Sequence, residues 1–118
     1  MDDARPLFLQ IAEQIEGQIV DGSMREEAQV PSINELAAFH RINPATALKG
    51  INLLVDAGIL YKKRGVGMFV AQGSREVLMS RRREAFRSQY VRPLVVEAAK
   101  LAITPRQLTQ MIEREAGR

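Results

Sequence analysis

Two short groups of residues in the middle of this chain have the types and the spacing to do chemistry. The first contains Thr46 and Lys49, a hydroxyl and an ammonium about one helical turn apart. The second is the basic run Lys62–Arg64, which is followed by Gly65 and Gly67. Hydroxyl and cationic groups bind phosphate oxygens and base edges, and glycines let a backbone approach such a ligand closely. These two groups indicate an interface for nucleic acid rather than a catalytic centre.

The first group lies on a predicted helix that begins beside Asn43 and Pro44. Asn43 has the side chain of a helix N-cap, and Pro44 suits the first helical position. The buried stripe of this helix is predicted to contain Ala47, Gly50, Ile51, Leu54 and Val55. The outward side of its N-terminal half is small, polar or cationic and lacks any acid, so it can approach base edges. These outward residues are Ala45, Thr46, Leu48, Lys49 and Asn52.

Another helix is predicted just before it, from Ser32 onward. Ser32 and Glu35 have the spacing of a capping box, in which each side chain bonds the backbone N–H of the other residue. The pair Arg41-Ile42 turns the chain, so the two helices form a helix-turn-helix. Asn34 is expected to point toward the same edge as the outward residues of the next helix. Asn34 therefore joins the candidate DNA-binding residues, which also include Ser32 and Asn43.

The second group forms the predicted tip of a β-hairpin. Two short strands are expected at Ile59–Tyr61 and Met68–Val70, on either side of the glycines. With little side-chain bulk at the tip, the backbone can approach a phosphate or enter the minor groove, and the cations add attraction. The residues assigned to this contact are Lys63, Arg64, Gly65 and Gly67.

An amphipathic helix is predicted over residues 7–20, where Leu7, Ile11 and Ile15 recur at steps of four. A polar loop is expected to follow this helix as far as Val30.

Gly50 lies inside the helix that begins at Pro44, where a glycine lowers helix stability by about 1 kcal/mol relative to Ala. We therefore expect another helix to pack closely against Gly50.

From a joint at Gln72–Ser74 onward, the chain is predicted to be a helical tail. Its apolar residues recur on one helical face, and Pro93 interrupts that face, so either a kink or a break is expected there. The tail has more apolar stripe than it can bury alone, which predicts a two-fold partner. The predicted contact residues of this homodimer are Leu78, Phe86, Tyr90, Leu94 and Ala98, with Ala102 on the same face.

The composition of the 118 residues argues against several classes of function. The chain has no cysteine, so disulfides and cysteine-built zinc sites are excluded. No segment resembles a signal peptide or supplies the roughly 20 apolar residues of a membrane span, so we expect a cytoplasmic protein without membrane contact. No nucleophile–base pair, metal cluster or phosphate-binding loop emerges. We therefore expect no enzyme activity, no catalytic residues, no metal and no cofactor.

Charge is unevenly distributed along the chain, which carries a net charge of +3. Residues 1–73 contain 7 Lys/Arg and 9 Asp/Glu, whereas residues 74–118 contain 10 Lys/Arg and 5 Asp/Glu. An argument for DNA binding therefore depends on local placement of charge.

For Arg81–Arg83 a solvated helix face is the default interpretation, with phosphate contact as the alternative. His40 is interpreted as a packed histidine rather than a base or a ligand.

Taken in order, these motifs resemble the helix-turn-helix of the GntR family of bacterial transcription regulators. The resemblance covers residues 5–71, from Pro6-Leu7-Phe8 to Gly67-Met68-Phe69-Val70. It implies that Asn43, Thr46 and Lys49 occupy DNA-contacting positions of a helix and that the two glycines lie on the wing of a winged helix. The region between Arg92 and Glu115 resembles the short helical C-terminal region of the YtrA-like branch.

Several residues depart from the pattern of the family. Asn34 stands where many members have Arg, and Leu48 stands at a position that is frequently Arg or variable. These two departures affect the identity of the operator rather than the mode of docking. Arg41 stands at a turn position where the family usually has Gly, so a left-handed conformation is expected there at a cost of roughly 1 kcal/mol. Glu27 likewise replaces a common turn glycine, and Met68 replaces a common Thr.

We therefore expect a mainly α protein with a small β-hairpin. A winged helix-turn-helix DNA-binding domain is predicted over residues 1–73, followed by a helical dimerisation or effector tail over residues 74–118. The expected function is sequence-specific regulation of transcription, and repression is implied by the family resemblance alone. The expected partners are a double-stranded operator with pseudo-palindromic half-sites, a second copy of the chain, and a small-molecule effector of unknown identity. The alternative is a winged-helix module for protein–protein contact without specific DNA binding.

Overall fold

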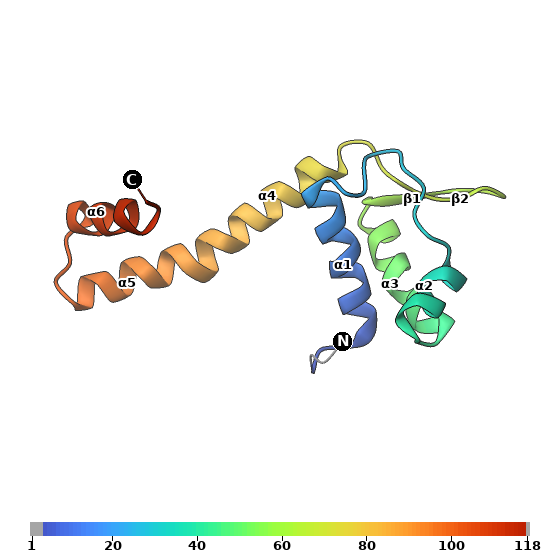
Figure 1. The fold of residues 1–118 in the computed structure, drawn as a ribbon, viewed down its shortest axis with the longest axis horizontal. Coiled ribbons are helices and arrows are strands. Elements are labelled where there is room, and N and C mark those ends of the chain that lie inside the picture. Colours follow the sequence, from blue (N-terminus) through green and yellow to red (C-terminus); the bar gives the residue numbers. More distant parts are fainter. Residues whose placement is uncertain (1–3, 118) are drawn as a thin grey trace. The chain divides into compact units, whose positions relative to one another are not determined.

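The computed structural model describes residues 4–117 and divides into two compact units, one ending at Met79 and one beginning at Ser80. The elements of the first unit are α1 (Leu7–Asp21), α2 (Ile33–His40), α3 (Pro44–Asp56), β1 (Leu60–Lys63), β2 (Gly67–Val70) and the start of α4 (Ser74–Phe86). The second unit contains the rest of α4, a π-helical turn η1 (Arg87–Val91), α5 (Arg92–Lys100) and α6 (Pro105–Glu115) (Figure 1). The predicted mainly α fold with one hairpin is confirmed. Among residues 4–117, no helix combines the length and the apolar character that crossing a bilayer requires.

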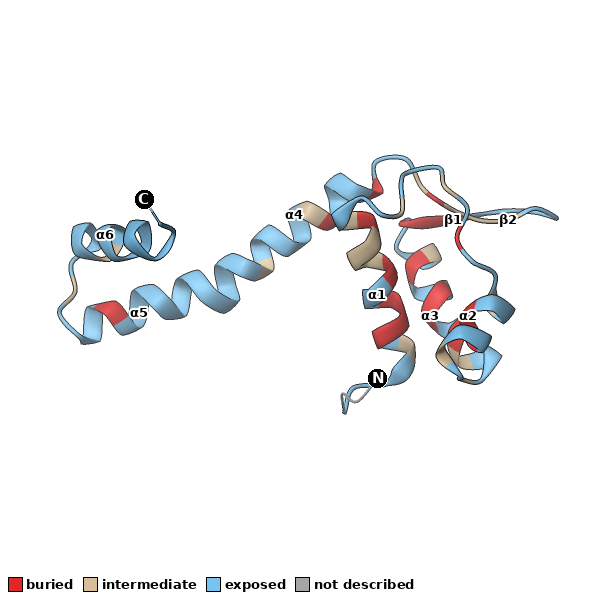
Figure 2. Ribbon diagram, in the orientation of Figure 1, coloured by how far each residue is buried: buried red, intermediate tan, exposed pale blue. Residues whose placement is uncertain are grey.

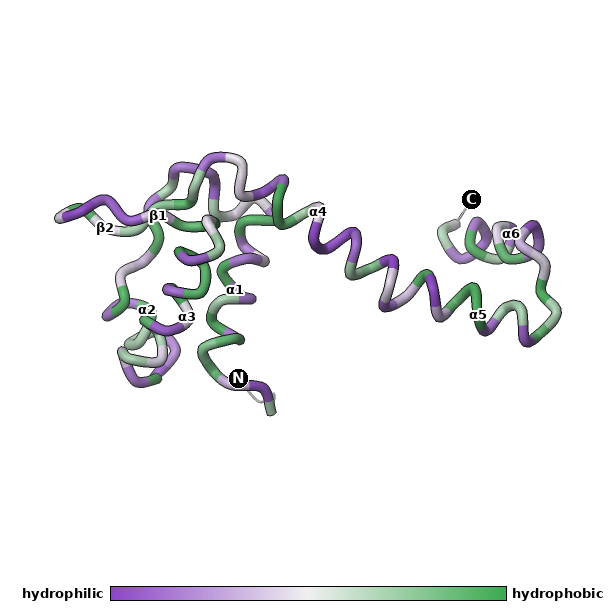
Figure 3. The backbone as a smooth tube through the Cα atoms, turned by 180° about the vertical axis from the view of Figure 1, so that it is seen from behind, coloured by the Kyte–Doolittle hydropathy of each residue, from purple (hydrophilic) through white to green (hydrophobic). Residues whose placement is uncertain are grey.

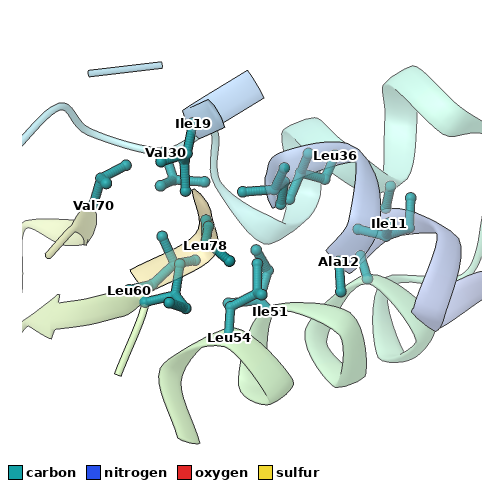
Figure 4. Packing of buried hydrophobic residues seen from close by; sticks show 14 residues of the cluster. Ile11, Ala12, Ile19, Val30, Leu36, Ile51, Leu54, Leu60, Val70 and Leu78 are labelled. Carbon is teal, nitrogen blue, oxygen red and sulfur yellow. The ribbon is translucent and has the colours of Figure 1, made fainter. Parts of the chain in front are cut away.

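The core of the first unit lies where α1, α2 and α3 pack against the base of the hairpin. Ile11, Ile15 and Ile19 follow one another at steps of four, so they line one face of α1, and each is at most 2% exposed. Ile51 and Leu54 face them from α3. The same cluster includes Val30, Leu36, Leu60, Val70 and Leu78 (Figure 4).

The close helix packing predicted at Gly50 is present between α1 and α3. A Cβ atom at Gly50 would lie 2.7 Å from the carbonyl oxygen of Phe8 and 3.2 Å from the Cβ of Ile11. A side chain at this position would therefore push the helices apart. α1 itself begins at Leu7, as predicted, and Pro6 lies in the N-cap position.

The hairpin pairs Leu60 with Val70 and Lys63 with Gly67 in antiparallel register. The segment before α2 was predicted to be a polar loop. In the structure it pairs with β2 on the side away from β1. Gln29 forms an isolated antiparallel bridge with Phe69, and the Val30 N–H donates to the Met68 carbonyl oxygen at 2.8 Å. This segment therefore fixes the hairpin to the helical core.

The first unit extends beyond the predicted boundary at residue 73. The Ser74 hydroxyl donates to the carbonyl oxygen of Ile59 at 2.7 Å, and Leu78 is only 3% exposed. Leu78 is thus a core residue of its own unit, which corrects its predicted place in a dimer contact. The first turns of α4 are anchored to the first unit for the same reason.

Pro93 is accommodated by a widened turn rather than by a break in the helix. Proline lacks an N–H, and its ring clashes with the carbonyl four residues earlier in a regular helix. The chain forms η1 immediately before it, and the Arg92 N–H donates to the carbonyl of Arg87, five residues back. Such single π-turns are a recognised way of relieving this conflict.

The tail helix ends earlier than its apolar pattern suggested. α5 stops at Lys100, and Ala102 has a positive φ of 57°. Ala102 therefore does not continue the helical face that was predicted to include it. α6 then begins as expected, because the Thr104 hydroxyl accepts from the Gln107 N–H at 3.1 Å. Figure 2 shows that the described part of the second unit is almost entirely exposed.

Candidate nucleic-acid interface

The candidate interface is built around α3, whose two sides differ sharply in burial. Ala47, Gly50, Ile51 and Leu54 are buried against the core. On the opposite side, Ala45, Leu48, Lys49 and Asn52 are exposed, and Thr46 is half-buried. We call Ala45, Thr46, Leu48, Lys49 and Asn52 the outer edge of α3. No acid lies between Asn43 and Val55, so this edge presents no charge that would repel a phosphate.

The start of α3 is held by the side chain of Asn43. Its Oδ1 accepts from the backbone N–H of Ala45 at 2.8 Å, as expected of an N-cap. Asn43 therefore positions the helix start, where the positive end of the helix dipole favours an approaching phosphate. Pro44 occupies the first helical turn, as predicted.

α2 begins with the predicted capping box. The Ser32 Oγ accepts from the Glu35 N–H at 3.1 Å, and a Glu35 carboxylate oxygen accepts from the Ser32 N–H at 2.9 Å. The backbone N–H of Ser32, and after it the Ser32 hydroxyl, stabilise the ionised carboxylate and lower the pKa of Glu35. The Ser32 hydroxyl is thus already used within the protein, whereas the Asn34 side chain is exposed.

Two non-glycine residues adopt the left-handed conformation in the turns that frame α2. Arg41, between α2 and α3, has φ 55° and ψ 49°. Its conformation, expected from the family resemblance, lets the Ile42 N–H donate to the Ala37 carbonyl at 3.0 Å. Glu27 has φ 69°. Each such residue costs roughly 1–2 kcal/mol, so the surrounding structure must hold these turns in place.

The tip of the hairpin carries the predicted cationic and glycine residues. Lys63 and Arg64 are exposed, and Gly65 has φ 77°, which glycine adopts without strain (Figure 3 shows this tip as hydrophilic). Gly67 has φ 144°, and a Cβ there would lie 2.5 Å from the amide nitrogen of Gln29. That amide donates to the Val66 carbonyl at 3.0 Å, so Gln29 braces the tip. Gln29 was not among the predicted site residues.

The two lysines of the interface each lie over an aromatic ring. The Lys49 Nζ is 4.0 Å from the centroid of Phe8, and the Lys63 Nζ is 4.8 Å from the centroid of Phe69. Phe69 also stacks on Tyr61, with 5.9 Å between centroids. The Tyr61 hydroxyl donates to a Glu27 carboxylate oxygen at 2.5 Å, and this bond raises the pKa of Tyr61. Neither aromatic partner was predicted, because no local pattern connects them to the lysines.

The predicted dimer residues fall into two groups. Phe86, Tyr90 and Leu94 are 58%, 63% and 42% exposed. Ala98, by contrast, is buried within the second unit at 5% exposure. Phe86, Tyr90 and Leu94 thus remain available to a partner, whereas Ala98 and the core residue Leu78 do not.

The arrangement can bind an anionic polymer, and residues 4–117 contain no cluster of His, Cys, Asp or Glu that could hold a metal ion. The same compact unit contains the N-terminus of α3, an acid-free edge with hydroxyl, amide and ammonium groups, and a cationic hairpin tip. These are the groups that hydrogen-bond phosphates and base edges.

Comparison with known proteins supports this description. The model of the family described as bacterial regulatory proteins of the gntR family matches residues 7–70. The transcriptional repressor NagR of Bacillus subtilis (strain 168) is 34% identical over 71 residues, which are 60% of this chain and 29% of NagR. The repressor YtrA of the same organism is 25% identical over 108 residues, which are 92% of this chain and 82% of YtrA. This chain therefore spans less than a third of NagR and most of YtrA.

Solved structures extend the similarity to both units. A GntR-family protein from Bacteroides thetaiotaomicron has a TM-score of 0.78 at 30% identity, covering 95% of this chain and 97% of that chain. The AraR DNA-binding domain, solved in complex with operator ORX1, has a TM-score of 0.55 at 34% identity. That match covers 57% of this chain and 81% of the AraR chain.

Proposed function

Because this chain belongs to the GntR family of bacterial regulatory proteins and is YtrA-like, we propose that it is a sequence-specific DNA-binding regulator of transcription in the cytoplasm. It binds duplex DNA through the outer edge of α3 and the tip of the hairpin. Repression by occupancy of an operator is its proposed mode of action, since NagR and YtrA are both described as repressors.

The observation that carries this proposal is the chemistry of the outer edge of α3. Thr46 and Asn52 can hydrogen-bond base edges or phosphates, and Leu48, 43% exposed, can contact a thymine methyl. Lys49 supplies a cation to the same edge. The AraR domain that resembles this unit was solved with an operator, which supports the assignment of DNA as the ligand.

A homodimer is the proposed functional form. The exposed side chains of Phe86, Tyr90 and Leu94 form an apolar face that a second copy can cover. A two-fold dimer duplicates the reading unit, so we expect pseudo-palindromic half-sites about 10 base pairs apart or a multiple of this spacing. A small-molecule effector that alters the dimer remains part of the proposal, with its identity open.

The test is selection of genomic fragments with the purified protein, followed by footprinting and a salt titration on the selected duplex. Protection of two related half-sites and a steep loss of affinity with rising salt are expected. Lys49→Ala is expected to weaken this binding while leaving the thermal unfolding of the protein nearly unchanged. Failure to select any duplex at low salt would favour the alternative, a winged-helix module for protein–protein contact.

A further inference from the structure

Helix α1 contributes a side chain to the proposed interface that the DNA-contact prediction did not include. The Phe8 ring is half-buried, and the Nζ of Lys49 lies 4.0 Å from its centroid. A cation at this distance over an aromatic face is attracted by the electrons of the ring. Phe8 is therefore the partner of the cation on the outer edge of α3.

The contact between α1 and α3 explains why the ring and the ammonium meet. Gly50 directly follows Lys49, and its missing side chain lets the Phe8 backbone approach α3 to a distance that a Cβ atom would not tolerate. Ile11, one turn further along α1, is 1% exposed and packs against the same site. The backbone that carries the ring is thus fixed by the buried core.

A fixed ring has a direct consequence for a lysine that must bind DNA. A free lysine side chain carries about 2 kcal/mol of rotamer entropy, part of which is lost when its ammonium contacts a ligand. A ring that already restrains the ammonium reduces this loss, as preorganisation does in any interface. The ammonium has three N–H donors, and the ring covers one side of it, so donors remain for a phosphate or a base.

We propose that Phe8 is a positioning residue for Lys49: its ring holds the ammonium in the orientation from which it contacts the operator. This inference rests on the proposed function and deepens it. Phe8 acts through Lys49 and makes no DNA contact of its own. The hairpin repeats the arrangement at greater distance, with the Nζ of Lys63 4.8 Å from the Phe69 centroid.

A double-mutant cycle tests this proposal. The affinity for the footprinted duplex is measured by fluorescence anisotropy for the wild type, Phe8→Leu, Lys49→Met and the double variant. Phe8→Leu is expected to weaken binding by about 2- to 5-fold per half-site, the range that an exposed cation–π contact supports. In the Lys49→Met background the same substitution is expected to have no effect, because the ammonium that it positions is gone.

Three further variants separate positioning from folding. Phe8→Tyr keeps an aromatic face and is expected to bind as the wild type does. Phe39→Leu is the matched control, since Phe39 is 78% exposed and its ring contacts His40 rather than a lysine, and no change is expected. Thermal unfolding of every variant is followed by circular dichroism. If Phe8→Leu does not fold, Phe8→Met completes the cycle, because methionine adapts to irregular apolar sites.

Equal weakening by Phe8→Leu in both backgrounds would overturn the inference, since Phe8 would then act without Lys49. Tighter binding by Phe8→Leu would also overturn it, because the ring would then withhold the ammonium from DNA. If Lys49→Met binds the duplex as tightly as the wild type, the Lys49 ammonium makes no useful DNA contact. That result would refute the inference as well. Failure of the wild type to bind any selected duplex would refute the proposed function itself, a result distinct from a zero coupling energy in a protein that binds.

Discussion

At the scale of single residues, Gly50 sets how closely α3 approaches α1 and therefore where the outer edge of α3 lies. The nearest atom to its absent Cβ is a backbone oxygen, that of Phe8, which cannot rotate away as a side chain can. The position of the outer edge of α3 relative to the core is thus set by the close packing of Gly50 and not by a hydrogen bond.

Gly50→Ala is expected to destabilise the first unit by about 1–2 kcal/mol. Alanine gains up to about 1 kcal/mol of helix propensity, but overpacking at a rigid contact costs about 1–3 kcal/mol. Urea denaturation followed by circular dichroism measures the difference. Asn52→Ala, on the exposed side of the same helix, is the control and is expected to be neutral or slightly stabilising. If Gly50→Ala stabilises the protein as much as Asn52→Ala, the contact with Phe8 is not as close as described.

At the scale of elements, the features that sequence predicted correctly are local ones. The caps formed by Ser32, Asn43 and Thr104 follow from residues at most three positions apart, so the pattern contains all the partners. The same holds for the apolar stripes of α1 and α3, whose spacing predicts which face is buried; the exception is Leu7, which is 39% exposed at the start of α1.

The features that sequence analysis missed involve partners that are distant along the chain. Gln29 forms a β-bridge with Phe69, and the Lys49 ammonium lies over the Phe8 ring. Both contacts form because the core brings these distant segments together. Leu78 lies on the same predicted stripe as Phe86, and only its packing shows that it belongs to the core. A helical pattern states which residues share a face but not what covers that face.

Glu26 connects the loop before α2 to the start of α4, and this link should depend on pH. Its carboxylate accepts hydrogen bonds from the backbone N–H groups of Gly73 and Arg75, the latter at 3.0 Å, and these bonds lower the pKa of Glu26 below its usual value of 4.5. Because the unfolded chain then binds a proton more readily, the stabilisation is present above the usual pKa. It is lost as the pH falls through the lowered pKa of the folded state.

Glu26→Gln is therefore expected to reduce the loss of stability on acidification. Thermal unfolding between about pH 6 and pH 3 is compared for the two proteins, and their melting temperatures should converge at the acidic end. Glu113→Gln, an exposed glutamate in α6, serves as the control for the loss of one negative charge. A melting-temperature difference that is constant across this range would contradict the assigned role of Glu26.

The hairpin tip should contribute to DNA binding mainly through charge. Replacing both Lys63 and Arg64 with Gln is expected to weaken binding and to make it less dependent on salt. The slope of log K against log salt should change by about 0.9 for each phosphate that the variant no longer neutralises. Lys100→Gln combined with Arg106→Gln removes the same charge from the second unit and is expected to leave the slope nearly unchanged. A slope unaffected by the hairpin variant would show that the tip does not touch the backbone of DNA.

At the scale of the whole molecule, the two units bury their apolar residues to very different degrees. The first unit has a closed core, whereas Phe86, Tyr90, Val95 and Val96 in the second unit are each at least half exposed. The rings of Phe86 and Tyr90 lie 5.5 Å apart and form one continuous apolar surface. Exposed apolar patches of this kind mark interfaces, which is why the proposed dimer is assigned to this unit.

Replacing Phe86 and Tyr90 with Ser is expected to shift the protein from dimer to monomer in sedimentation velocity experiments. Because a monomer reads one half-site, affinity for the full operator should fall while binding to an isolated half-site is retained. Phe39→Ser, which removes an exposed ring from the first unit, is the control and should remain dimeric. A dimer that persists after the double substitution would contradict the assigned interface.

The most direct test of the central claim, that the outer edge of α3 and the hairpin tip together read duplex DNA, is one anisotropy titration. The wild-type protein is titrated onto its footprinted duplex and onto a scrambled duplex of equal length, from about 50 to 200 mM salt. The account predicts a large preference for the footprinted sequence and a loss of affinity of about 10³-fold or more across this range for a dimer that makes six or more phosphate contacts. Equal affinity for both duplexes, or binding that does not respond to salt, would contradict it.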